Sequence, residues 1–138
     1  MQRRNFLKNS GIAAFAGTAM IVPGCTPGNP KLLGATQIQH GVIFSLKHEK
    51  GSPEALKFLE DGRRILSGIP VVQQFQAFDQ VSPKNDYEYG FSMVFDGMDA
   101  YEEYNEHPDH VDFVENRWKK EVTEFLEIDF RTHKGQEV

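Results

Sequence analysis

The sequence predicts an α+β fold, in which an antiparallel sheet of four strands carries helices on one face. Four short segments have alternating apolar residues, as half-buried strands do, and the segments between them include runs with apolar residues at helical spacing. The predicted elements lie within residues 37–133, a length that is typical of a single domain. We therefore expect one domain with one core.

The first two elements are a strand and a helix. The strand is expected over Gln37–Lys47, where alternate residues are apolar and His40 shares their side. A helix is expected from the capping residue Ser52 to a stop at Gly68, with a stripe facing the sheet. The predicted stripe is Ala55, Leu59, Gly62 and Leu66. Glycine within a helix costs about 1 kcal/mol relative to alanine, so either the sheet approaches closely at Gly62 or a pocket opens there.

Two further strands are expected in the middle of the chain. They are Val71–Asp79 and Tyr87–Phe95, joined by the turn-forming residues "SPKND". One face of the second of these strands is aromatic and apolar, with Tyr87, Tyr89, Phe91, Met93 and Phe95. This face is predicted to be core, and a ligand pocket would use the same residues.

A helix pair and a last strand complete the domain. A short helix over Gly97–Glu106 precedes a second helix that begins at Pro108, where a proline's missing N–H has no cost. The buried stripe of the second helix is predicted as Val111, Val114, Trp118 and Val122. The strand Glu124–Phe130 alternates apolar residues with acidic ones. The resulting order, strand–helix–strand–strand–helix pair–strand, is the ferredoxin-like βαββαβ arrangement.

A single sheet of this kind has a second face that no helix covers. In this sequence that face carries enough mixed apolar and polar residues to predict partial cover by a second subunit. We therefore expect a homodimer.

Residues 1–24 are expected to be an export signal peptide. A basic start precedes an apolar run that ends at Val22 and is shorter than the roughly 20 residues that a membrane-spanning helix needs. The letters "RRNFLK" resemble the twin-arginine export motif, and "VPGC" resembles a bacterial lipobox apart from Pro23. The lipobox predicts a lipid on Cys25; the alternative is that Cys25 is an incidental thiol and cleavage occurs elsewhere.

Residues 25–36 are expected to be the lipidated cysteine and a tether rich in proline and glycine. The predicted location is outside the cytoplasm, on a membrane that faces the periplasm or the cell exterior. Three of the 15 lysines and arginines lie in the signal peptide, so 12 basic residues face 20 acidic ones in the remainder. This acidic balance argues against nucleic acid as a partner and leaves the acyl chains as the expected attachment to the membrane.

Several stretches of the predicted domain resemble one known family. They are "HGVIFSLK" in the first strand, "GIPVVQQFQAF" after the first helix, and "YNEHPDHVDFV" followed by a strand that ends in "IDF". Together they resemble the stress-responsive A/B barrel (Dabb) family over about residues 37–131. The resemblance implies a dimeric α+β barrel, in which two four-stranded sheets close on each other.

The same resemblance implies a candidate catalytic pair. The olivetolic acid cyclases of plants, which belong to this family and use no cofactor, employ a tyrosine and a histidine of this cluster in an aldol condensation. By motif these residues correspond to Tyr104 and His110, and His40 corresponds to a first-strand histidine near the pocket. A histidine can accept a proton near neutral pH, and a tyrosine hydroxyl can stabilise the enolate that forms.

Three further residues are expected to contribute to substrate binding. Tyr89 stands where the cyclase has a histidine, and Gly62 stands where it has a tyrosine, which predicts a different substrate. His107 is expected to stabilise the conformation of the pocket. A structural interpretation stays open, in which His107 lies beside the start of a helix, His110 bonds to the backbone and Tyr104 is a core aromatic residue.

No metal and no cofactor are expected. His40, His107 and His110 could meet, but zinc-binding helices use histidines four residues apart or cysteine partners, and the sequence shows no cofactor motif. The function predicted is a lipid-anchored domain that binds a small, partly apolar molecule, with lyase, cyclase or isomerase activity if it is an enzyme. The alternatives are a non-enzymatic stress-response or structural barrel and a small cofactor-free monooxygenase.

Overall fold

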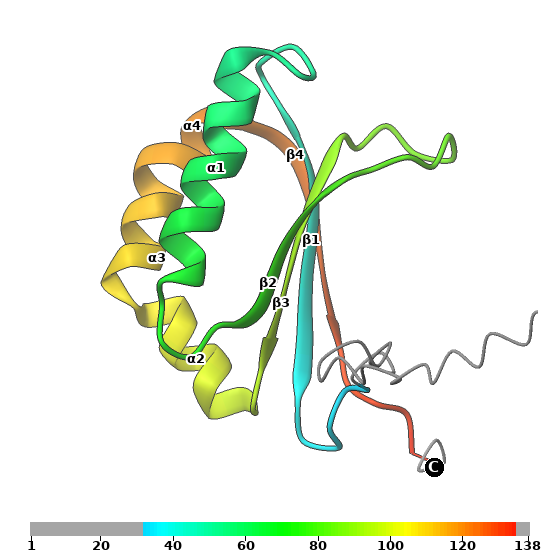
Figure 1. Ribbon diagram of the computed structural model, residues 1–138, viewed down its shortest axis with the longest axis vertical. Helices are drawn as coiled ribbons and strands as arrows, with labels where there is room; N and C mark the ends of the chain where they lie inside the picture. Colours follow the sequence, from blue (N-terminus) through cyan, green and yellow to red (C-terminus); the bar gives the residue numbers. More distant parts are fainter. Residues whose placement is uncertain (1–31, 135–138) are drawn as a thin grey trace, which may run out of the picture. The chain divides into compact units, whose positions relative to one another are not determined.

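The structure, a computed structural model, describes residues 32–134 as an α+β domain (Figure 1). Its elements are β1 (Ile38–Leu46), α1 (Pro53–Ser67), β2 (Gln73–Asp79), β3 (Tyr89–Phe95), α2 (Met98–Glu106), α3 (Pro108–Phe113), the π-helical segment η1 (Val114–Trp118), α4 (Lys119–Glu121) and β4 (Val122–Phe130). The predicted ferredoxin-like order is therefore confirmed.

The predicted signal peptide and Cys25 lie outside the described residues and stay predictions. The last residues of the predicted tether are described, and the Thr132 hydroxyl donates a hydrogen bond to the Leu33 carbonyl at 3.1 Å. No helix among residues 32–134 combines the length and the apolar character that crossing a membrane requires.

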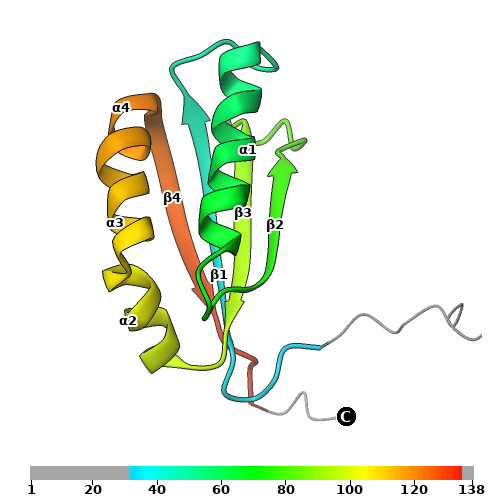
Figure 2. The ribbon, with the colours of Figure 1, turned by 60° about the vertical axis from the view of Figure 1, so that its left-hand side comes forward.

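The four strands form one antiparallel sheet in the order β2-β3-β1-β4. All helices lie on one face of it, and the other face is open, as the two views in Figures 1 and 2 show. The central strand β1 pairs with β3 and with β4, and this register places His40 opposite Met93 on one side and Asp129 on the other. Residues from three strands thus meet beneath the helices.

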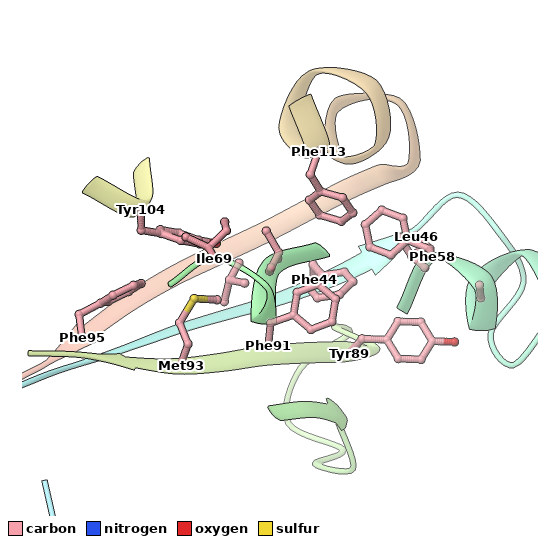
Figure 3. Close-up of a cluster of buried hydrophobic side chains, with 13 residues drawn as sticks. Phe44, Leu46, Phe58, Ile69, Tyr89, Phe91, Met93, Phe95, Tyr104 and Phe113 are labelled. Carbon is pink, nitrogen blue, oxygen red and sulfur yellow. The ribbon is translucent and has the colours of Figure 1, made fainter. Parts of the chain in front are cut away.

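The core lies between the sheet and the helices (Figure 3). The alternation predicted for β1 is confirmed, since the residues on its helix-facing side are all buried: Ile38, His40, Val42, Phe44 and Leu46. Stacked and tilted aromatic rings fill the centre: Phe44, Phe58, Phe91 and Phe113. Such rings contribute more than their buried area alone, by about 0.5–1.5 kcal/mol for each pair.

The predicted stripe of the second helix is wrong in part. Val111 is exposed and Val122 begins β4, whereas Phe113, which the stripe omitted, is buried. The helix instead presents His110 and Phe113 to the core. The π-helical turn of η1 then changes the spacing of residues along the face, because a π turn holds more residues than an α turn.

Strand β4 places its acidic residues toward the helices. Pairing with β1 sets Glu127 opposite Val42 and Asp129 opposite His40, both on the helix-covered face. The apolar residues of the alternation, Leu126, Ile128 and Phe130, therefore lie on the open face, where they are exposed.

Gly62 is a point of close approach between α1 and the core. A Cβ atom at this position would lie 2.8 Å from Cζ of Phe91 and 3.2 Å from Cζ of Phe113. Of the two possibilities that the sequence left open, the structure shows the close approach, because these two rings occupy the space above the glycine.

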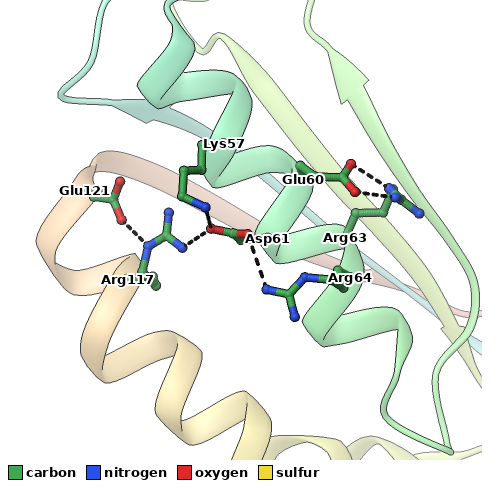
Figure 4. A network of polar contacts seen from close by, with 7 residues as sticks. All are labelled: Lys57, Glu60, Asp61, Arg63, Arg64, Arg117 and Glu121. Atoms are coloured by element: carbon green, nitrogen blue, oxygen red, sulfur yellow. Dashed lines mark hydrogen bonds and ion pairs between the residues drawn. The ribbon is translucent and has the colours of Figure 1, made fainter.

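A cluster of charged side chains joins α1 to η1 on the outer side of the helices (Figure 4). The carboxylate of Asp61, which is largely buried, accepts a hydrogen bond from Nη1 of Arg117 at 2.5 Å and pairs with Lys57 and Arg64. Nε of Arg117 donates to Glu121 at 2.6 Å. The hydrogen bond from Arg117, more than any other contact, lowers the pKa of Asp61 to about 2.

Substituting Gly62 by alanine is expected to destabilise the domain, although alanine gains about 1 kcal/mol of helix propensity. The new methyl group would overlap Phe91, and overpacking of a core costs about 1–3 kcal/mol. Denaturant unfolding of Gly62→Ala should therefore show a net loss of stability. In a Phe91→Leu background the same substitution should cost less; a stabilised Gly62→Ala protein would contradict the close approach.

Substituting Asp61 by asparagine is expected to cost about 2 kcal/mol at neutral pH, since each unit of pKa shift corresponds to about 1.4 kcal/mol. The folded-state pKa lies below the ordinary value of 3.8, so this stabilisation is present above about pH 4 and is lost as the pH falls toward 2. Unfolding curves at several pH values should show the wild type and Asp61→Asn converging in acid. Glu60→Gln, which removes an exposed pair with Arg63 on the same helix, should change stability little at any of these pH values.

Candidate functional site

A cavity of about 330 Å³ lies between the helix-covered face of the sheet and the segment from α2 to α4. Most of its wall is apolar and comes from Val42, Leu66, Phe91, Met93, Phe113, Val114, Trp118 and Phe125. Its polar lining comes from His40, Tyr104, Asn105, His110, Lys119 and Glu127. An apolar pocket with a few convergent polar groups is the usual form of a site for a small molecule.

His110 is fixed by the junction between α2 and α3. The connection is tight, because His107 caps α3 by accepting a hydrogen bond from the Asp109 backbone N–H and Pro108 opens the helix. The junction brings the ring of His110 against the end of α2, where its Nδ1 lies 3.1 Å from the carbonyl oxygen of Asn105. A carbonyl only accepts, so Nδ1 carries the proton.

The other ring nitrogen of His110, Nε2, is left with a lone pair. Among residues 32–134 it has no hydrogen-bond partner. Burial, the largest influence, lowers the pKa of His110 and keeps the ring neutral at neutral pH. His110 therefore has the protonation state that a general base needs.

Tyr104 lies directly against His110. Their ring centroids are 4.2 Å apart, and the tyrosine ring also packs on Phe95, so that Tyr104 is only 3% exposed. Its hydroxyl has no hydrogen-bond partner among the described residues. Burial raises the pKa of Tyr104 well above its usual range, so the hydroxyl stays protonated and is free to donate to a ligand.

His40 enters the cavity from β1 and is held by two other side chains. Its Nδ1 lies 2.6 Å from Oδ1 of Asp129, and the Tyr101 hydroxyl lies 3.2 Å from the same nitrogen. The Tyr101 hydroxyl donates to the second carboxylate oxygen, Oδ2, at 3.2 Å. Burial, followed by the charge of Asp129, raises the pKa of Tyr101 to about 12.

Asp129 and Tyr101 are site residues that the sequence alone does not indicate. The sequence places Asp129 on the acidic side of the last strand, and only the pairing of that strand with β1 shows that this side faces the helices. The spacing of Tyr101 and Tyr104, three residues apart on one helix, was the available signal, because such residues share a helix face.

Three residues predicted to bind substrate lie outside the cavity lining. The space beside Gly62 is filled by aromatic rings, and the Tyr89 hydroxyl accepts a hydrogen bond from the Gly51 backbone N–H at 2.9 Å. His107 serves as the cap of α3. The structure therefore brings together His40, Tyr104 and His110 and gives the other three structural contacts.

No group of three or more histidine, cysteine, aspartate or glutamate side chains within residues 32–134 is arranged to hold a metal ion. His107 in particular is absent from the cavity lining that His40 and His110 share.

Three solved structures illustrate what the domain is similar to. A Dabb family protein with a ferredoxin-like fold from Mesorhizobium loti is 50% identical, with a TM-score of 0.70, and the match covers 70% of this chain and 97% of that one. The hydroxynitrile lyase of Passiflora edulis is 8% identical, with a TM-score of 0.64, over 73% of this chain and 97% of that one. A dimeric ferredoxin-like protein from Thermobifida fusca is 15% identical, with a TM-score of 0.61, over 76% and 99%.

Comparison of the sequence with curated proteins gives no match. The family model described as the stress responsive A/B barrel domain matches residues 38–132, which is most of the chain and nearly all of the described domain. The two lower-identity structures show a shared fold, whereas the family model and the Mesorhizobium loti protein agree on the family. The chain therefore belongs to the stress responsive A/B barrel domain family.

Proposed function

We propose that this domain is a cofactor-free acid–base enzyme of the lyase, cyclase or isomerase type that acts on a small carbonyl compound. The observation that carries the proposal is the contact between His110 and Tyr104 inside an apolar cavity, where each keeps one polar atom without a partner among residues 32–134. Neither atom is among the fully buried side-chain atoms that lack a partner, so both are accessible from the cavity, and two such polar groups in an apolar pocket favour a ligand that bonds to them.

The proposed reaction begins with removal of a proton from the carbon next to the carbonyl group. Nε2 of His110 accepts the proton, and the hydrogen bond from Nδ1 to the Asn105 carbonyl stabilises the imidazolium that forms. The Tyr104 hydroxyl donates a hydrogen bond to the oxygen of the developing enolate. The apolar wall keeps water away from this intermediate and strengthens both interactions.

The cavity also limits the substrate. A volume of about 330 Å³ is at the small end of the range for ligand pockets, roughly 300–1,000 Å³. The wall of aliphatic and aromatic side chains favours an apolar body, with its carbonyl group at the end where Tyr104 and His110 meet. The hydroxynitrile lyase from Passiflora edulis has a similar fold. It supports the proposal only by showing that this fold is compatible with lyase chemistry.

A second proposal concerns assembly. The open face of the sheet carries Phe78, Leu126, Ile128 and Phe130, each of them 39–56% exposed. Glycines at positions 41 and 90 line a shallow hollow on the same face, together with Ile43 and Phe78. An apolar surface of this kind favours cover by another chain, and the similar structure from Thermobifida fusca is of a dimeric protein. We propose that two copies pair through this face.

The catalytic proposal predicts exchange of α-protons. In D₂O, a panel of small aldehydes and ketones with α-hydrogens should include compounds that the wild type deuterates, as followed by proton NMR. His110→Gln, which can still donate to the Asn105 carbonyl, should lower the rate about 10²–10⁴-fold, and Tyr104→Phe about 10²-fold or more. The rate should fall in acid as His110 becomes protonated, with a midpoint below the ordinary histidine value of 6.5 because burial lowers its pKa.

The matched control is His107→Asn, which keeps a capping side chain but removes the other histidine of the cluster. It should retain the exchange rate, and all variants should melt near the wild-type temperature. If no panel compound is exchanged, and native mass spectrometry finds the same retained molecule on the wild type and on His110→Gln, the domain is a binding protein instead.

The assembly proposal predicts that Leu126→Lys on the open face yields a monomer in light scattering with an unchanged far-UV spectrum. Val111→Lys on α3 is the matched control, because both residues are 46% exposed, and it should leave the dimer intact. A wild-type protein with a monomeric mass would reject the pairing.

A further inference from the structure

A second histidine of the cavity is held in a fixed orientation by side chains from two different elements. His40 lies on β1, Asp129 lies directly across from it on β4, and Tyr101 reaches both from α2. We propose that Tyr101 is a positioning residue: through Asp129 it fixes His40 as a second proton-transfer group beside Tyr104. This inference rests on the proposed acid–base function and deepens it.

The neutral ring of His40 carries its proton on Nδ1. A carboxylate only accepts, so the short contact of 2.6 Å between Nδ1 and Asp129 places the ring proton on Nδ1. Nε2 is then the remaining polar atom, and it has no hydrogen-bond partner among residues 32–134. The ring is 5% exposed and lines the cavity, so a ligand in the cavity is the natural partner of Nε2.

Asp129 cannot hold this position by packing alone. It lies on the edge strand β4, and its side chain is 41% exposed, so water competes with His40 for the carboxylate. The Tyr101 hydroxyl occupies the second oxygen and limits rotation of the carboxylate away from His40. The tyrosine is itself fixed, because its ring packs on the rings of His40 and Phe95 at 5.2 and 5.1 Å.

The two histidines differ in the group that orients each of them. His110 is oriented by a neutral backbone carbonyl, whereas His40 is oriented by a carboxylate that compensates positive charge when the ring takes a second proton. His110 is therefore suited to remove a proton and His40 to deliver one. Both rings lie within 6.2 Å of the Tyr104 ring, measured between centroids.

The proton balance then defines a reaction class. The substrate loses one proton from carbon to Nε2 of His110 and gains one, at a second carbon or at an oxygen, from Nε2 of a His40 ring that has taken up a proton from solvent. Exchange with solvent returns both rings to their starting states, and no electrons are transferred. Substrates that lose and gain protons at different atoms, as in isomerisation, aldol addition or elimination, fit this arrangement.

The test measures the tautomer of His40 directly, without a substrate. Long-range ¹H–¹⁵N NMR of the full labelled domain at about pH 9, where an ordinary imidazole is neutral, should show His40 with its proton on Nδ1. Asp129→Ala should abolish this form, and Tyr101→Phe, which removes one oxygen atom, should convert a visible fraction to the form protonated on Nε2. Tyr87→Phe, a matched loss of a hydroxyl away from the cavity, should leave the spectrum of His40 unchanged.

The outcomes separate the two proposals. If Tyr101→Phe retains the wild-type tautomer while Asp129→Ala loses it, Tyr101 has no positioning role and the inference is overturned. If Tyr101→Phe alters the tautomer and also lowers kcat for α-proton exchange with little change in KM, both proposals are supported. If it alters the tautomer but the wild type exchanges no compound of the panel, the positioning holds and the catalytic proposal fails.

Discussion

The pairing of β1 with two neighbours at once is the constraint on which the rest of the structure depends. A strand that is hydrogen-bonded along both edges cannot slip by one residue without turning every side chain to the opposite face of the sheet. The buried side of β1 holds Phe44 in the aromatic core and His40 in the cavity. The same register that builds the core therefore also places His40 in the lining of the cavity.

The helices complete the cavity under a second constraint, which comes from charge. Arg117 of η1 is tied to Asp61 of α1, so the face of η1 that carries Trp118 is held over the sheet. On the other side, the capped junction between α2 and α3 presents Tyr104 and His110 together. The apolar wall and the polar end of the cavity are thus fixed by different contacts, one on each side of the helical layer.

The sequence was sufficient for the parts that local patterns determine. Alternation identified the strands and the buried face of β1, and Pro108 located the start of α3. The resemblance to the family supplied Tyr104 and His110, which the structure places in contact.

The remainder depends on contacts between segments that are far apart in the chain. Asp129 reaches His40 through strand pairing across 89 residues, and no local pattern specifies that register. The π-helical turn of η1 changes the spacing on which the predicted stripe depended. Gly62 left two physical explanations open until the positions of Phe91 and Phe113 decided between them.

The two histidines differ in how easily a substitution can remove the group that orients them. The group that orients His110 is the backbone carbonyl of residue 105, which every amino acid possesses, so the asparagine side chain can vary and reshape the cavity without disturbing that histidine. His40 depends on two side chains, and a single substitution at either of them can remove its support. Substitutions at residue 105 can therefore reshape the cavity while His110 keeps its orientation, whereas the orientation of His40 can be gained or lost in a single mutational step.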